Sequence, residues 1–122
     1  MSRVRSKNTT PEVVVRSMVF SMGYRYRLHD RRLPGKPDLV FPGRRKAIFV
    51  NGCYWHGHEN CKCARIPKTH VSYWRDKLRK NRRRDRNNVS ELMANGWEVL
   101  TIWQCELKNP EKLKAKLDVF LK

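Results

Sequence analysis

The sequence predicts an α/β fold in which a mixed central sheet is flanked by helices. Three observations indicate it: an amphipathic segment near the start, short apolar runs over residues 24–50, and a long basic helix followed by one more strand and a last helix. The chain has 122 residues, so we expect one domain, residues 1–122, with a modest core that a bound metal would help to stabilise.

The first helix is predicted over residues 9–22. Pro11 suits the first helical turn, and Gly23 suits the position just after a helix end. Glu12 lies on the same helical face as two valines. We interpret it as an acidic partner of the positive helix end, with an inward-pointing carboxylate as the alternative. Residues 1–8 are polar and basic, and we expect them to form a flexible arm.

Four segments read as strands. Residues 24–28 alternate aromatic and Arg side chains, as an edge strand does. Asp38–Phe41 and Lys46–Val50 are apolar runs on either side of a Pro42-Gly43 turn, which predicts a hairpin. Residues 97–103 are mostly β-branched and aromatic, and they predict the last strand.

A helix is predicted over residues 72–95, with a length of roughly 36 Å at 1.5 Å per residue. Six of the eight residues from Arg79 to Arg86 are cationic, and such a run is usually a solvent-facing side of a helix. The opposite face is an apolar stripe that also contains a carboxylate, which needs a partner because burying it alone is costly. The stripe consists of Trp74, Leu78, Asp85, Val89 and Leu92. A final amphipathic helix begins at Asn109-Pro110.

The formal net charge of +17 points to an anionic partner. Nucleic acid is the first interpretation; an anionic membrane surface and a structural RNA are the alternatives. The sequence contains no apolar run long enough to span a bilayer and no signal-peptide pattern. We therefore expect a cytoplasmic protein, in which four cysteines are metal ligands or thiols rather than disulfides.

Thiols and imidazoles are concentrated between residues 53 and 63, and one more cysteine stands after the last strand. Tetrahedral zinc takes such ligands, and a closed four-ligand site would be structural. Six candidates exceed the four positions: Cys53, His56, His58, Cys61, Cys63 and Cys105.

Asp38 follows a proline at the start of a strand, where a carboxylate can hold Mg²⁺ at a sheet end. Together with His56 or His58 as a proton acceptor, it suggests a nuclease. His29 and His70 have no comparable surroundings in the sequence, and we interpret them as surface or packing residues.

Several motifs together resemble the very-short-patch-repair (Vsr) DNA mismatch endonucleases. They are Pro34-Gly-Lys-Pro-Asp38, Ile48-Phe-Val-Asn-Gly-Cys-Tyr-Trp-His-Gly-His58, Lys80-Asn81 with Arg84-Asp85-Arg86, Gly96-Trp97 and Trp103-Gln-Cys105. The resemblance implies a restriction-endonuclease-like fold and nicking of one strand at a T·G mismatch left by 5-methylcytosine deamination. It also implies double-stranded DNA as substrate and a mismatch-repair protein as partner. We expect a monomer.

The resemblance also implies roles for single residues. Asp38 and the Val50 main-chain carbonyl would bind Mg²⁺, and His56 would be the general base, supported by Glu12 and Asp85. Zinc would be held by Cys53, His58, Cys61 and Cys105. Tyr54, Trp55 and Trp74 would enter the DNA at the mismatch, and the long helix would grip the backbone through Lys80, Arg82, Arg83 and Arg86.

The sequence departs from the family pattern at several points. Asn51 stands where a His is frequent, Cys63 is close enough to Cys61 to be the alternative zinc ligand, and the basic arm is short. The acid-x-Lys pair that is typical of restriction-like nucleases is not visible in the second strand of the hairpin, because residues 46–50 contain no acid. Two other functions stay open: a restriction-linked nicking nuclease of the same fold, and a non-catalytic zinc-stabilised DNA-binding module.

Overall fold

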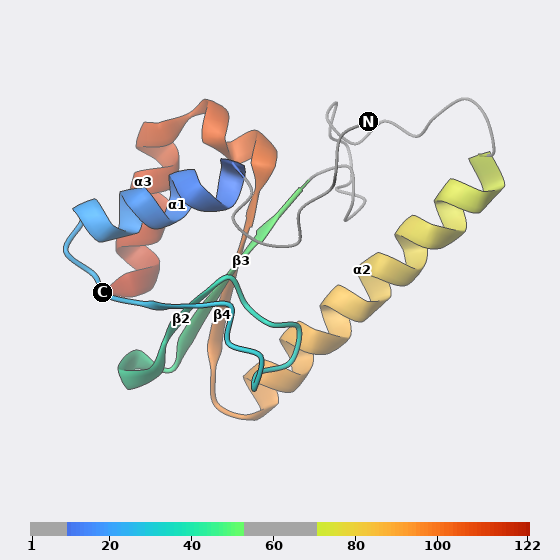
Figure 1. The fold of residues 1–122 in the computed structure, drawn as a ribbon, viewed down its shortest axis with the longest axis horizontal. Coiled ribbons are helices and arrows are strands. Elements are labelled where there is room, and N and C mark those ends of the chain that lie inside the picture. Colours follow the sequence, from blue (N-terminus) through green and yellow to red (C-terminus); the bar gives the residue numbers. More distant parts are fainter. Residues whose placement is uncertain (1–9, 53–70) are drawn as a thin grey trace.

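The computed structural model describes residues 10–52 and 71–122 (Figure 1). The helices are α1 (Thr10–Ser21), α2 (Val71–Ala94) and α3 (Pro110–Leu121), and the strands are β1 (Arg27–Leu28), β2 (Leu39–Phe41), β3 (Lys46–Asn51) and β4 (Glu98–Trp103). Two 3₁₀ turns, η1 (Pro42–Arg44) and η3 (Gln104–Lys108), follow β2 and β4. The predicted helix, strand, strand, strand, helix, strand, helix order is confirmed.

The four strands form one sheet in the order β1-β2-β3-β4. β1 pairs with β2 and β2 with β3 in antiparallel register, whereas β3 and β4 are parallel, with Asn51 opposite Trp103. The predicted mixed sheet and the hairpin around Pro42-Gly43 are therefore confirmed. Because β3 and β4 are parallel, their C-terminal ends lie at the same end of the sheet.

One face of the sheet packs against α1 and α3, and α2 lies on the other side (Figure 1). A hydrophobic core lies between the sheet and α1 and α3, and in α3 it uses every fourth residue, as one helical face requires. It consists of Val15, Val19, Leu39, Phe41, Ile48, Ile102, Leu113, Leu117 and Leu121. This arrangement is the predicted mixed sheet flanked by helices.

The long helix α2 carries the predicted stripe. Leu78 and Leu92 are buried, and Trp74, Asp85 and Val89 are half-buried. Figure 1 shows that the C-terminal part of α2 lies beside the sheet, while its other end extends away from it. Within the described ranges no helix has the length and apolar character to cross a membrane.

The first strand is shorter than predicted, because β1 covers two residues where the alternation suggested five. Tyr24 and Tyr26 instead form hydrogen bonds with main-chain carbonyls of α1. The Tyr24 amide donates to the Val19 carbonyl at 3.4 Å, and the Tyr26 hydroxyl donates to the Arg16 carbonyl at 3.2 Å. The Tyr26 ring also meets the Phe41 ring edge-on. The alternation therefore reflects packing of the two tyrosines on the core rather than strand pairing.

The loop between β1 and β2 turns sharply and lies against α2. His29, Gly35 and Lys36 all have positive φ, of 51°, 75° and 50°. At Gly35 a Cβ would lie 2.9 Å from the Cβ of Asn88 on α2, so only glycine permits this approach. The loop ends at Asp38, and its contact with α2 therefore helps to place that residue.

We predict that Gly35→Ala lowers the free energy of unfolding by about 1–3 kcal/mol, because the methyl group meets both an unfavourable φ and the Asn88 side chain. Gly43→Ala is the matched control, since its backbone is ordinary and no atom lies within 4 Å of its added Cβ. Urea unfolding of both variants measures the difference. Equal effects at the two glycines would contradict the close contact between loop and helix.

Candidate active site

Three ionisable side chains from separate parts of the fold meet beside the first two strands. They are Glu12 from α1, His29 just after β1 and Asp38 just before β2. One potential ligand atom from each lies within 4.8 Å of the other two. Two carboxylates at this spacing can hold a divalent cation, and the imidazole lies beside them.

Glu12 is buried, with 1% of the residue exposed. His29 Nε2 lies 2.6 Å from Glu12 Oε2, and the Arg16 guanidinium donates to the same oxygen at 3.4 Å. These partners offset the cost of burying a carboxylate. The inward-pointing alternative for Glu12 is thus the observed one, rather than a helix-end partner facing solvent. His29, which the sequence led us to interpret as a surface or packing residue, contacts this buried carboxylate.

Asp38 is held by the backbone of His29, just after β1, and by the backbone of Val50 in β3. Its Oδ2 accepts a hydrogen bond from the Val50 amide at 2.7 Å, and its own carbonyl accepts from the His29 amide at 3.2 Å. The N–H and C=O of one strand residue point to the same side. The Val50 carbonyl is therefore directed toward the side of β3 on which Asp38 lies.

These groups match the ligand preferences of a hard cation. Mg²⁺ binds oxygen ligands from one or two carboxylates and otherwise keeps its waters. The carboxylates of Glu12 and Asp38 provide such oxygens in one place, and the Val50 carbonyl is directed toward the side of β3 on which Asp38 lies. The residues present therefore fit the cation that the family resemblance implies.

Three further predicted residues lie within the described ranges. Asn51 is 7% exposed at the end of β3, and Asp85 is half-buried on α2. Cys105 is half-buried in η3, directly after β4. In sequence, Cys105 stands two residues after Trp103 and Cys53 two residues after Asn51, and Asn51 and Trp103 are register partners.

Many of the predicted ligands lie outside the described residues. This applies to the predicted general base His56, to the loop ligands and aromatics, and to the basic arm. The full set is residues 1–8, Cys53, Tyr54, Trp55, His56, His58, Cys61, Cys63 and His70.

The predicted DNA-contacting residues of α2 are mostly solvent-facing. Lys80, Arg83 and Arg86 are exposed, and Arg82 is half-buried. Trp74 is half-buried near the start of α2, where the Tyr73 ring meets it edge-on at 5.4 Å and the Lys77 ammonium lies 5.6 Å from its ring centroid. The helix therefore carries a cationic side and an aromatic group at its far end.

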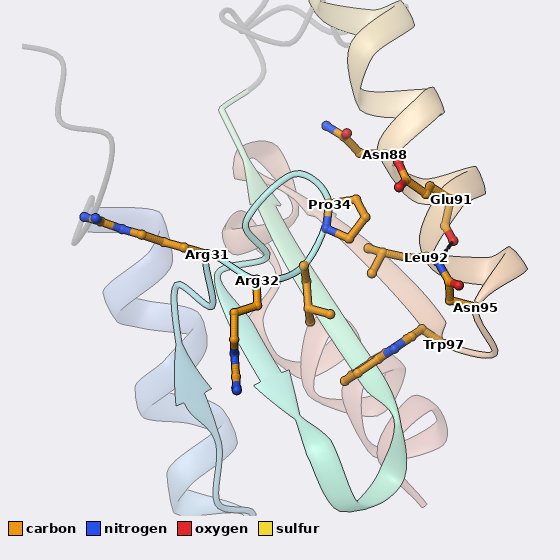
Figure 2. Close-up of a pocket in the computed structure, with 9 residues that line it drawn as sticks. Arg31, Arg32, Pro34, Asn88, Glu91, Leu92, Asn95 and Trp97 are labelled. Carbon is orange, nitrogen blue, oxygen red and sulfur yellow. Dashed lines mark hydrogen bonds between the residues drawn. The ribbon is translucent and has the colours of Figure 1, made fainter.

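A cavity of about 540 Å³ separates the loop between β1 and β2 from α2 (Figure 2). Its apolar lining residues are Leu33, Pro34, Leu92 and Trp97, and Asn88, Glu91 and Asn95 line it from α2. Arg31 points away from α2 in this view. Arg32 is turned to Asp30, with Nε and Nη2 each near one carboxylate oxygen, and this pairing lowers the pKa of the Asp30 carboxyl.

Comparisons with known proteins agree on one family. The sequence model described as DNA mismatch endonuclease Vsr matches residues 1–63. The type II nicking enzyme V.XorIIP of Xanthomonas oryzae pv. oryzae is 51% identical over 117 residues, 96% of this chain and 85% of that protein. The DNA mismatch endonuclease Vsr of Escherichia coli K12 is 38% identical over 113 residues, 93% of this chain and 72% of that protein.

A solved structure has the same fold. The catalytic domain of the homing endonuclease I-Bth0305I superposes with a TM-score of 0.62 at 27% identity, and the match covers 93% of this chain and 94% of that one. The mixed sheet with its flanking helices is therefore an endonuclease fold.

Proposed function

The chain belongs to the family of the DNA mismatch endonuclease Vsr, and on this premise we propose that it nicks one strand of duplex DNA at T·G mismatches left by 5-methylcytosine deamination. The observation that carries the proposal is the meeting of Glu12 and Asp38 beside the Val50 backbone. A binding module has no need of two carboxylates held together in this way, whereas phosphodiester hydrolysis does.

We assign distinct tasks to the residues of this site, and the geometry of Glu12, Asp38 and Val50 supports the first of them. Asp38, Glu12 and the Val50 carbonyl would hold Mg²⁺, which when bound supplies positive charge at the scissile phosphate. The Val50 amide keeps the Asp38 carboxylate oriented. We propose that His56 accepts a proton from the attacking water, and that Asp85 supports the site from α2.

Recognition of DNA would rest on α2 and on the aromatic residues. Lys80, Arg82, Arg83 and Arg86 would contact backbone phosphates, and the affinity would fall as salt rises. Trp74, Tyr54 and Trp55 would stack at the mismatched step. A mispaired base costs less to unstack than a paired one, which favours insertion there.

A second candidate is a nicking nuclease of the same chemistry that serves a restriction system. It is favoured by the names of several relatives, which are type II nicking enzymes, among them V.XorIIP and V.NmeAIP of Neisseria meningitidis. The two candidates differ in the sequence flanking the nicked position rather than in the catalytic residues.

We predict that the protein nicks a labelled duplex with one T·G pair on the T-containing strand, in the presence of Mg²⁺, and leaves the T·A duplex intact. Asp38→Asn should lower the rate by at least about 100-fold, because it removes a charged ligand. Asp118→Asn on α3 is the matched control, since that carboxylate pairs with Lys122 at the chain end. Randomised flanking bases in the T·G duplex then show which sequence is preferred.

Equal cutting of the T·G and T·A duplexes would agree with nuclease activity but contradict recognition of the mismatch. Binding without any cutting, unchanged by Asp38→Asn, would contradict the nuclease itself and favour the binding module.

We also propose that Cys53, His58, Cys61 and Cys105 hold a structural zinc ion. The parallel register of β3 and β4 supports this, because Cys53 and Cys105 follow register partners by the same number of residues.

We predict that Cys105→Ser abolishes the one equivalent of zinc found by elemental analysis and lowers the free energy of unfolding by more than about 3 kcal/mol. Cys63→Ser is the control, and it should keep both the bound zinc and the wild-type free energy of unfolding. Loss of zinc in Cys63→Ser with retention in Cys61→Ser would assign the fourth position to Cys63 instead.

A further inference from the structure

His29 contacts the proposed metal ligands, yet it has no task in the reaction described above. Its backbone has a φ of 51°, in the left-handed region, and its amide donates to the Asp38 carbonyl at 3.2 Å. This hydrogen bond continues the β1–β2 pairing by one residue beyond Leu28–Leu39. The position of the imidazole is therefore set by the same pairing that places Asp38.

The imidazole reaches from this position to α1. Its Nε2 lies 2.6 Å from Glu12 Oε2, and its side chain is only 18% exposed. An ionised carboxylate accepts hydrogen bonds and donates none. A carboxylate that binds a metal ion is deprotonated, so in the metal-binding site Nε2 must carry the proton of this contact and donate it.

A protonated Nε2 has no lone pair left for a metal ion, so this nitrogen cannot be a ligand while it bonds to Glu12. What it can do is restrict the Glu12 side chain, which otherwise has three rotatable bonds. The second cationic contact to the same oxygen is weaker, because Arg16 Nη1 is 3.4 Å away and its side chain is 23% exposed. His29 is thus the closer of these two contacts on the carboxylate.

We propose that His29 is a positioning residue, which holds the Glu12 carboxylate toward Asp38 so that both acids meet one divalent cation. The inference rests on the proposed function in one respect, namely that Glu12 and Asp38 bind a metal ion together. Residues of this kind orient a metal ligand without touching the metal. Their removal typically lowers metal affinity or activity by roughly 10–100-fold.

Two substitutions separate this task from the folding of the loop. In His29→Gln the amide nitrogen lies at about the reach of Nε2 and can still donate to Glu12. In His29→Asn the side chain is too short, although Asn tolerates positive φ as well as His does. Thermal unfolding of both variants checks that the loop remains folded.

The first readout is the affinity of the protein alone for Mn²⁺, measured by calorimetry without DNA. We expect His29→Asn to weaken it by about 10–100-fold and His29→Gln to retain most of it. Arg16→Gln, which alters the longer contact, should have a smaller effect than His29→Asn. In a Glu12→Gln background, His29→Asn should have little further effect, because it acts through Glu12.

The second readout is the Mg²⁺ concentration that gives half-maximal nicking, which should rise in His29→Asn and recover in His29→Gln. Unchanged Mn²⁺ affinity in a folded His29→Asn variant would overturn the proposal, as would equal losses in the Asn and Gln variants. A wild-type protein that binds no Mn²⁺ would overturn it as well. If Mn²⁺ binding follows the prediction but no duplex is nicked, His29 keeps its task and the proposed function fails.

Discussion

The burial of the Glu12 carboxylate is the constraint on which the rest of the site depends. A charge that is 1% exposed needs compensating partners, and two of them, Arg16 and His29, come from different segments of the chain. Arg16 lies one turn further along α1, whereas His29 follows β1. The charge therefore ties the first helix to the edge of the sheet, at the point where β2 begins.

The pairing of β1, β2 and β3 turns this local tie into a site. The His29 amide meets the Asp38 carbonyl across the first pair of strands, and the Asp38 carboxylate meets the Val50 amide across the second. Asp38 is thus held from both sides by backbone groups, which are less mobile than side chains. The loop that precedes it is in turn fixed against α2 at Gly35. Two carboxylates separated by 26 positions in the sequence are brought together with little freedom to move.

Local sequence patterns predicted the elements well, because Pro11, Gly23 and the apolar periodicities determine helix and strand boundaries without reference to the rest of the fold. The residues gathered around Glu12 were harder. The direction of Glu12 depends on how α1 packs against the sheet, and the role of His29 depends on which residue faces Asp38 across β1 and β2. Both are long-range facts that neither spacing nor composition contains. The local signal that could have drawn attention to His29 is its residue type, because His tolerates positive φ and stands here just after an alternating segment.

The central claim is that Glu12, Asp38 and the Val50 backbone surround one cation, and line broadening of amide signals by Mn²⁺ in NMR spectra tests it directly. Substoichiometric Mn²⁺ should first broaden the amide signals of Glu12, His29, Asp38 and Val50, since the effect falls steeply with distance from the ion. Broadening centred on other acidic residues, such as Glu111 and Asp118 of α3, would contradict it. A uniform loss of amide signal across residues 10–52 and 71–122 would also contradict it.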